Sequence, residues 1–496
     1  MKKGKKILTG ILELFTLISF IYLTLFIGDK HEPWADEAQA WLLARDTTIP
    51  ELLQNYMGYE GSPALWHLIL KAFIAIGWKY EYYYVIPILF SAIGVAILEF
   101  KTKIPLIFKI TIPFTYYIFY QYSIVARSYC LLFPTLMYLA TIYNKKTEKP
   151  ILFGIGIAIL LSISAHTCIL AATISFIYGL QVLKLSYNYI KKKDSISLKL
   201  LIKNWIVIFV LFSLFLVTAY YVRTPADHVE FKNIEYRKWK YIITILSDSL
   251  ITNDKNILMC LGTSIVAVIV LFVGYFRDKR FFEAILLILP VYLFLALFYC
   301  NKWHIGIIFE IILFILIVHN KLKEDRLIQI IFLLVCAVQI IYSVNTAIYD
   351  LTRQYSACED IVRFINNNNY QDKNIYGIGY SATAIEPYFE KNIFGNKKNN
   401  KGFYSWRENE PEYMTVEEMK DNLPEILIIS SFSSSSYASL INRVETGKLY
   451  EKYYFEGATY VKDEVYENEG FYVYVSINLL SANKDFKNSE VVILNR

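Results

Sequence analysis

Two adjacent carboxylates, Asp36 and Glu37, are the strongest local signal for chemistry in this sequence. They follow a long apolar run and stand between two tryptophans, Trp34 and Trp41. In such a pair one acid can accept a proton while the other orients a substrate, and the two could hold a divalent cation such as Mg²⁺ or Mn²⁺. The plain alternative is a helix start, where the helix dipole favours both acids. The spacing leaves both interpretations open.

Apolar segments make up most of the chain and must position these acids. Of the 496 residues, 55% are hydrophobic and 17% are aromatic, which lies well outside the range of soluble domains. Runs long enough to cross a hydrocarbon core of about 30 Å recur up to Thr346 and stop there. They predict a polytopic α-helical membrane protein with about eleven spans. The predicted spans are residues 7–27, 84–100, 110–122, 128–143, 151–165, 167–185, 204–222, 257–275, 281–299, 305–318 and 327–346.

The distribution of lysine and arginine sets the expected topology. The first apolar run follows a lysine-rich start and lacks a small-residue cleavage pattern, which indicates a retained anchor and a cytoplasmic N-terminus. Threading the spans from that side places the basic clusters at 101–109, 145–149, 191–203, 277–280 and 321–326 in the cytoplasm. A further apolar stretch, 64–78, would reverse this order if it crossed. We therefore interpret it as a juxtamembrane helix, with His67 and Lys71 on one polar face.

This topology gathers the unusual polar residues at the outer face of a multi-pass plasma-membrane protein. Asp36 and Glu37 lie in the first outer loop, and the others stand at the outer ends of spans. These others are Arg127, His166, Arg223, His228, Lys302 and His304. Each of them could anchor the chain at the interface instead of taking part in chemistry. Glu310, inside a predicted span, is a functional candidate by default or a partner for a neighbouring helix.

After Thr346 the pattern changes to short alternating units. Helical stretches at 355–366 and 416–422 and strand-like stretches at 374–378, 425–430 and 471–475 predict a small α/β domain. Between them, residues 386–412 predict a long polar surface loop, with an aromatic island at 402–406. We expect a transmembrane catalytic domain at 1–348, which includes the first outer loop at 28–83, and an extracytoplasmic α/β domain at 349–496.

Several other classes are disfavoured. The net charge of +6 comes from short lysine clusters between apolar runs, so we expect membrane lipids and no nucleic acid as partners. The cysteines form neither a disulfide framework nor a zinc-type spacing. An Asp-X-Asp motif, a Walker-type phosphate loop and a large cytoplasmic domain are all missing from the sequence, which argues against a soluble-type nucleotide-sugar transferase.

Several motifs together resemble the GT-C superfamily of membrane glycosyltransferases, in particular the branch related to protein O-mannosyltransferases and lipid A aminoarabinose transferases. The motifs are the opening anchor, the Asp36–Glu37 pair, and the stretches 61–67, 126–129 and 303–306. The proline pair common in the family is here Ser62-Pro63, and its doubled histidine is here Trp303-His304. These departures leave the identity of donor and acceptor open.

The resemblance implies an inverting transferase that moves a sugar from a polyprenyl-phosphate donor to a glycan, lipid or protein acceptor at the outer face. Asp36 would be the base, and Glu37 would orient the acceptor or hold a divalent cation. Arg127 would engage two oxygens of the donor phosphate. Weaker candidates for the donor phosphate are Lys302, His304 and His166, and candidates for contacts to acceptor or donor are His67, Lys71, Trp34 and Tyr129.

Two rival hypotheses come from other classes. A polytopic transporter or lipid flippase would be expected to show two matching halves with interrupted helices and a site near the bilayer midplane, and the sequence shows no internal repeat. A non-catalytic assembly protein would use its outer α/β domain to bind a partner. Loss of activity on changing Asp36 alone would exclude the second rival.

Overall fold

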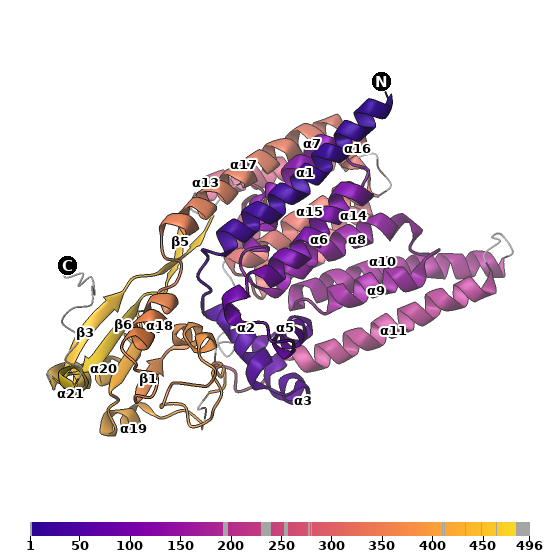
Figure 1. Ribbon diagram of the computed structural model, residues 1–496. Coiled ribbons are helices and arrows are strands. Elements are labelled where there is room, and N and C mark those ends of the chain that lie inside the picture. The colour runs from indigo at the N-terminus through magenta and orange to yellow at the C-terminus, as the bar shows by residue number, and fades with distance from the viewer. Residues whose placement is uncertain are drawn as a thin grey trace. The chain divides into compact units, whose positions relative to one another are not determined.

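The computed structural model describes residues 2–191, 197–229, 240–251, 256–275, 278, 280–408, 410, 412–431, 433–447, 449–462 and 464–482. The chain divides into two compact units. We call Met1–Gly28, Leu53–Trp66 and Tyr84–Asn345 the membrane unit, and Asp29–Leu52, His67–Tyr83 and Thr346–Arg496 the sheet unit. Figure 1 labels their helices and strands in chain order. Lys192, Lys193, Arg277 and Lys279, which belong to the predicted cytoplasmic clusters, lie outside the described residues.

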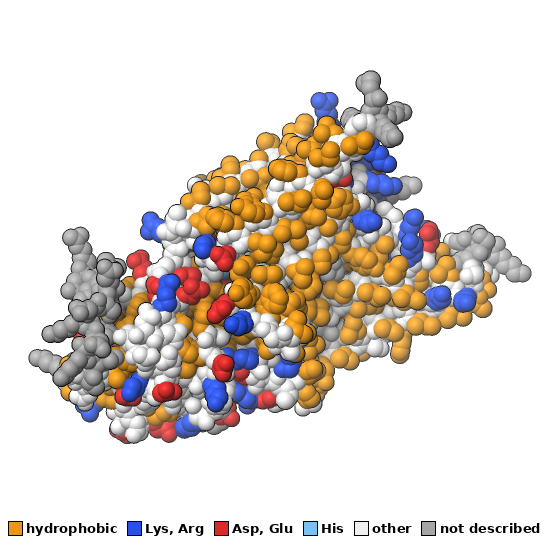
Figure 2. All heavy atoms as spheres, viewed as in Figure 1, with side chains coloured by type: hydrophobic (Ala, Val, Ile, Leu, Met, Phe, Trp, Pro, Cys, Tyr) orange, Lys and Arg blue, Asp and Glu red, His pale blue; other side chains and the backbone are white. Residues whose placement is uncertain are grey.

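Long apolar helices dominate the membrane unit, as predicted. Among the described residues, six helices are long and apolar enough to cross a membrane. They are α1 (Lys2–Gly28), α6 (Val85–Lys101), α10 (Ala165–Ile190), α11 (Leu198–Val222), α13 (Ile257–Tyr275) and α17 (Arg326–Thr352), whose last turns belong to the sheet unit. On the face of the molecule that Figure 2 shows, apolar side chains cover much of the surface of the helices. Such a surface is suited to lipid, and the chain has the character of a helical membrane protein.

The remaining predicted spans are shorter or broken in the structure. The expected span at 110–122 is divided into α7 (Leu106–Thr111), η3 (Ile112–Phe114) and η4 (Tyr117–Gln121), because Pro113 cannot continue an α-helical hydrogen-bond ladder. The other short elements are η5 (Ser128–Leu131), α8 (Leu132–Ile142), η6 (Tyr143–Lys145), α9 (Pro150–Leu161), α14 (Phe281–Leu297), η8 (Lys302–Ile305), α15 (Gly306–Val318) and α16 (Lys321–Glu324). The number of spans therefore stays a prediction.

The first outer loop forms helices in both units. The sheet unit receives α2 (Ala35–Asp46), α3 (Ile49–Glu51) and η2 (Tyr80–Tyr82), and the membrane unit receives α4 (Met57–Glu60). The boundary between the units along the chain falls within η1 (Leu52–Tyr56) and within α5 (Leu65–Ala75). The helix α5 lies within the predicted juxtamembrane stretch. A further helix, α12 (Lys240–Leu250), was not predicted from the sequence.

A four-stranded sheet organises the second unit. Its order is β1-β2-β6-β3, with β1 parallel to β2 and the other pairs antiparallel. The strands are β1 (Ile375–Ile378), β2 (Ile426–Ser430), β3 (Tyr450–Phe455) and β6 (Phe471–Ser476), and β4 (Ala458–Val461) pairs with β5 (Glu464–Asn468) in a separate ribbon. The unit's helices are α18 (Cys358–Asn367), η9 (Tyr380–Ala384), η10 (Glu386–Tyr388), α19 (Val416–Asp421), α20 (Ala438–Thr446) and α21 (Ile477–Ala482).

Both faces of this sheet are covered, because alternate residues of its central strand point to opposite sides. Ile426 and Ile428 join one core with residues of α18, and Leu427 and Ile429 join another with residues of α19 and α20. The predicted strands at 374–378, 425–430 and 471–475 are confirmed as β1, β2 and β6, and the predicted helices are confirmed as α18 and α19. The first core also includes Ala38, so α2 packs as part of the sheet unit.

Candidate functional site

The acid pair lies in the first turn of α2. Trp34 is the N-cap residue, and its backbone N–H donates to Glu37 Oε2 over 3.2 Å. Such a bond satisfies one of the amide groups that a helix start leaves without a partner. Both acids therefore lie at a helix start, as the plain alternative expected, and a chemical role for either of them stays a prediction.

Glu37 is fully buried and faces a histidine that the sequence interpretation did not consider. His31 Nε2 lies 3.1 Å from Glu37 Oε2, and His31 Nδ1 lies 2.9 Å from Asp350 Oδ2. Burial lowers the pKa of His31, but the charges of Asp350 and Glu37 and their hydrogen bonds outweigh it and hold the pKa well above its usual value. His31 therefore bridges two buried acids, and its raised pKa favours the protonated ring. Glu37 belongs to this arrangement.

Asp36 points to a different environment. Its side chain is half-buried, and its Oδ1 accepts a hydrogen bond of 2.7 Å from the Tyr380 hydroxyl at the start of η9. Adjacent residues of one helical turn therefore have different surroundings, with the accessible carboxylate at Asp36.

Three aromatic rings lie together beside this carboxylate. The ring of Tyr380 is 4.7 Å from that of Trp406 and 5.5 Å from that of Tyr404, and the last two are 5.0 Å apart, measured between centroids. All three side chains are half-exposed. We call Tyr380, Tyr404 and Trp406 the aromatic triad. Two of its members come from the predicted aromatic island, to which the sequence analysis assigned no role.

The segment that carries Tyr404 and Trp406 is fixed to α2. Gln39 Nε2 donates to the Tyr404 carbonyl over 2.9 Å, and the Tyr404 N–H donates to Gln39 Oε1 over 2.8 Å. The Gly402 N–H donates to Asp46 Oδ2 over 2.8 Å, and Phe403 is buried. Because Gln39 lies one helical turn after Asp36, the triad is tied to the helix that carries the acid.

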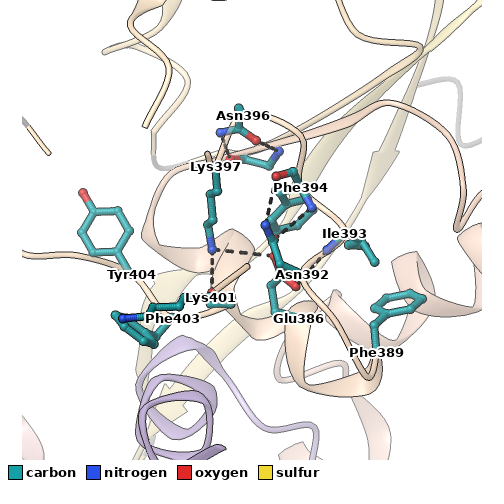
Figure 3. A network of polar contacts seen from close by, with 12 residues as sticks. Glu386, Phe389, Asn392, Ile393, Phe394, Asn396, Lys397, Lys401, Phe403 and Tyr404 are labelled. Carbon is teal, nitrogen blue, oxygen red and sulfur yellow. Dashed lines mark hydrogen bonds and ion pairs between the residues drawn. The ribbon is translucent and has the colours of Figure 1, made fainter. Parts of the chain in front are cut away.

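A buried ion pair holds the earlier part of the same loop. Lys397 Nζ lies 3.7 Å from Glu386 Oε1 and donates to the Gly402 carbonyl over 2.5 Å, as Figure 3 shows. Burial raises the pKa of Glu386 to about 7, against the opposing charge of Lys397. Asn396 exchanges two hydrogen bonds with the backbone of Gly377 in β1. The predicted loop is present, but it is anchored at many points.

Three other predicted site residues of the sheet unit are buried or bonded to the backbone of a helix. Trp34 is buried at the start of α2, and Lys71 Nζ donates to the carbonyls of Ala44 and Thr47 at the end of that helix. Basic side chains often bind the last carbonyls of a helix in this way. His67 is buried within α5, and burial lowers its pKa to about 4. Their predicted contacts to acceptor or donor stay predictions.

The membrane unit gathers most of the predicted donor-binding residues in a second cluster. The Arg127 guanidinium carbon lies 6.0 Å from the centroid of the Trp303 ring. The ring of His304 lies 4.4 Å from that of His166 and 5.6 Å from that of Tyr129. Lys302 begins η8 beside them and is half-buried. We call Arg127, Tyr129, His166, Lys302 and His304 the basic cluster.

Backbone contacts position these rings. His166 Nε2 lies 2.9 Å from the Tyr299 carbonyl oxygen, and His304 Nδ1 accepts from the Asn301 N–H over 2.8 Å. The Tyr122 hydroxyl donates to the Trp303 carbonyl over 2.6 Å. At Gly306 a Cβ atom would collide with the ring of Tyr117, so only glycine allows this close approach of α15 and η4.

The remaining polar candidates contact other residues than those of the basic cluster. Arg223 has its guanidinium carbon 4.5 Å from the Tyr220 ring centroid, and buried His228 has its Nε2 2.9 Å from the Tyr59 carbonyl oxygen. Glu310 is fully buried in α15, and neither of its carboxylate oxygens has a hydrogen-bond partner among the described residues. A buried carboxylate of this kind remains a functional candidate.

The described part of the chain shows no set of side chains that would complete a metal site at the acid pair. Within it, no three His, Cys, Asp or Glu side chains gather as a group that could hold a metal ion. Glu37 is occupied by His31 and by the Trp34 amide, so the acid pair does not offer two carboxylates to one ion. The divalent cation stays a prediction.

Sequence reasoning missed the residues that distinguish the two acids. Tyr380 is 344 positions from Asp36, and Asp350 is 319 positions from His31. His31 and Glu37 lie in the same short loop, and that closeness was a usable signal for their contact. The contact of His31 with Asp350 could be found only in the folded chain.

Comparison with known proteins adds no relative to this description. No protein-family model matches the sequence, and no curated protein matches it either.

Proposed function

We propose that this chain is a membrane glycosyltransferase that moves a sugar from a polyprenyl-phosphate donor to an acceptor hydroxyl at the outer face, with inversion at the anomeric carbon. The observation that carries the proposal is the accessible Asp36 carboxylate, which accepts a hydrogen bond from Tyr380 while its neighbour Glu37 is occupied with His31. A half-exposed carboxylate in a fixed position suits a general base.

In the proposed step, the acceptor oxygen attacks the anomeric carbon of the donor sugar. The new carbon–oxygen bond forms as the bond between that carbon and the phosphate oxygen breaks, and its electron pair leaves with the phosphate. The acceptor proton passes to an oxygen of Asp36. The products are the glycosylated acceptor and the polyprenyl phosphate, and the proton is later released to water.

The leaving phosphate gains negative charge, which cations held in place beforehand would stabilise. The basic cluster supports this part of the proposal. Arg127 can engage two phosphate oxygens, and its position over Trp303 restricts the guanidinium. Lys302, His304 and His166 are additional donors for the same phosphate.

The test uses purified protein in lipid nanodiscs with a panel of radiolabelled polyprenyl-phosphate hexoses and pentoses and candidate acceptors. Wild type should transfer label, and Asp36→Asn should lose on the order of 10²–10⁴-fold in rate. Asp29→Asn is the matched control, because Asp29 is an exposed acid of the same loop, and its Oδ2 lies 3.0 Å from Lys30 Nζ. Absence of donor consumption by wild type, or an equally active Asp36→Asn protein, would overturn the proposal.

A transporter or flippase is the second candidate function, and Glu310 is the observation that favours it. A fully buried carboxylate within an apolar helix is typical of ion and proton pathways. In proteoliposomes, Glu310→Gln should abolish movement of the lipid-linked sugar if the chain is a flippase, whereas Asp36→Asn should leave that movement unchanged. The opposite pattern for label transfer supports the transferase.

A further inference from the structure

The proposed transfer step does not use the rings of the aromatic triad, yet the triad lies directly beside the proposed base. Tyr380 contributes to both, because its hydroxyl bonds Asp36 and its ring packs against Trp406. Two of the three ring pairs meet edge to face and the third is tilted, and each of the three side chains is partly buried. An enclosed aromatic core would bury them, as it buries Phe403 in the same segment.

The segment is also more rigid than a loop of its length would be by default. Gln39 holds the backbone of Tyr404 through both its donor and its acceptor, and Ser405 N–H donates to the Tyr413 hydroxyl over 2.8 Å. Lys401 pairs with Glu51, and Lys397 pairs with buried Glu386. A binding surface held in place before its ligand arrives loses little conformational entropy on binding.

The chemistry of this surface fits one class of ligand. A pyranose ring has an apolar face of C–H groups and an edge of hydroxyls, so it can rest on an aromatic ring while a carboxylate accepts from a hydroxyl. A polyprenyl chain would need an apolar groove without a charged group. Here the aromatic faces and the Asp36 carboxylate are adjacent.

We propose that the aromatic triad is a subsite for a saccharide acceptor, which rests on Tyr404 and Trp406 and presents a hydroxyl to Asp36. This inference rests on the proposed function, since it names the acceptor class of the same site. Tyr380 and Trp406 would determine which hydroxyl reaches the carboxylate. The acceptor would then be a glycan chain, and a peptide or lipid acceptor is the alternative that the test must separate.

The binding test needs no donor and uses the full chain in nanodiscs on an array of oligosaccharides beside an array of peptides. Wild type should bind at least one oligosaccharide, and Tyr404→Ala and Trp406→Ala should each weaken that binding about tenfold or more. Trp406→Phe keeps an aromatic face and should retain most of the affinity. Tyr454→Ala is the matched control and should bind as wild type does, because it removes an exposed ring of β3 that lies tilted 4.9 Å from the ring of Tyr472.

The outcomes separate this inference from the function on which it rests. Asp36→Asn should still bind the oligosaccharide, because the amide oxygen can accept a hydrogen bond, while transfer is lost. Oligosaccharide binding without transfer from any donor would leave the subsite standing and overturn the transferase. Transfer to a peptide or lipid with no oligosaccharide bound, or equal weakening by Tyr454→Ala and Trp406→Ala, would overturn the subsite.

Discussion

The surroundings of Asp36 in the sheet unit and the basic cluster of the membrane unit are built in contrasting ways. Asp36 and the aromatic triad are half-exposed, and hydrogen bonds from α2 hold their loop. In the basic cluster His166 and His304 are buried, and ring packing and backbone carbonyls fix them. Under the proposed transfer reaction, the contrast matches two tasks, because a base must meet a variable acceptor while charges that stabilise a leaving phosphate must be fixed beforehand.

Each cluster also depends on a different kind of support. Near Asp36 the support is ionic, since His31 lies between Glu37 and Asp350. Near Arg127 it is aromatic, since Trp303 and Tyr129 provide the packing surfaces. Changes at His31 should therefore lower stability more than they lower the transfer rate. Changes at Arg127 should lower the transfer rate more than they lower stability.

The largest expected effect is that of His31→Gln on stability. The substitution leaves two buried carboxylates facing a neutral amide, and breaking a buried ion pair in this way costs about 3–5 kcal/mol. Thermal unfolding of the purified protein, followed by near-ultraviolet circular dichroism, should show a clearly lower midpoint. His67→Gln is the control, because His67 is a buried histidine of the same unit whose lowered pKa of about 4 keeps it neutral. A similar loss for both variants would remove the special role of His31.

The pH dependence of that effect has a definite sign. The folded pKa of His31 is raised above its unfolded value, so its contribution to stability is complete below about pH 6.5 and is lost as the pH rises through the folded pKa. The difference in unfolding midpoint between wild type and His31→Gln should therefore be largest at neutral or mildly acidic pH and should narrow in alkaline buffer. A difference that widens with pH would contradict the imidazolium.

The next effect in size is that of Arg127→Ala on transfer. Removing one fixed group that stabilises developing charge typically costs about 10²–10³-fold in rate. Arg127→Lys should recover part of the rate, since it keeps the charge but not the two-oxygen geometry. Arg223→Ala is the matched control, because it removes another arginine of the same unit that lies over an aromatic ring, that of Tyr220. Radiolabel transfer at saturating acceptor measures all three, and equal rates for Arg127→Ala and Arg223→Ala would reduce Arg127 to an interface anchor.

The smallest expected effect is that of Gln39→Ala. It leaves the Tyr404 amide and carbonyl without their partners, at a cost of about 1–3 kcal/mol, and loosens the aromatic triad. The acceptor KM should rise several-fold with little change in kcat, because Gln39 positions the subsite and does not touch the reacting atoms. Gln371→Ala, at an exposed glutamine of the same unit, should behave as wild type. A fall in kcat without a change in KM would place Gln39 in another role.

The sequence determined the features that depend on neighbouring residues. Apolar runs predicted the long helices, and alternation predicted β1, β2 and β6, because side-chain periodicity is a local property. It failed at 110–122, where Pro113 divides an apolar run into short helices, and it did not predict α20 or β3. The Asp36–Glu37 pair was also visible as adjacent acids after an anchor.

Only the tertiary structure decided what each acid does. Glu37 bonds His31, which also bonds Asp350, and Asp36 accepts from Tyr380; the contacts to Asp350 and Tyr380 join residues more than 300 positions apart in the chain. Gln39 and Tyr404 likewise meet only in the folded chain, as do Arg127 and Trp303. The physical reason is that burial and hydrogen bonding set the protonation and access of a carboxylate, and both come from segments that meet only when the chain folds.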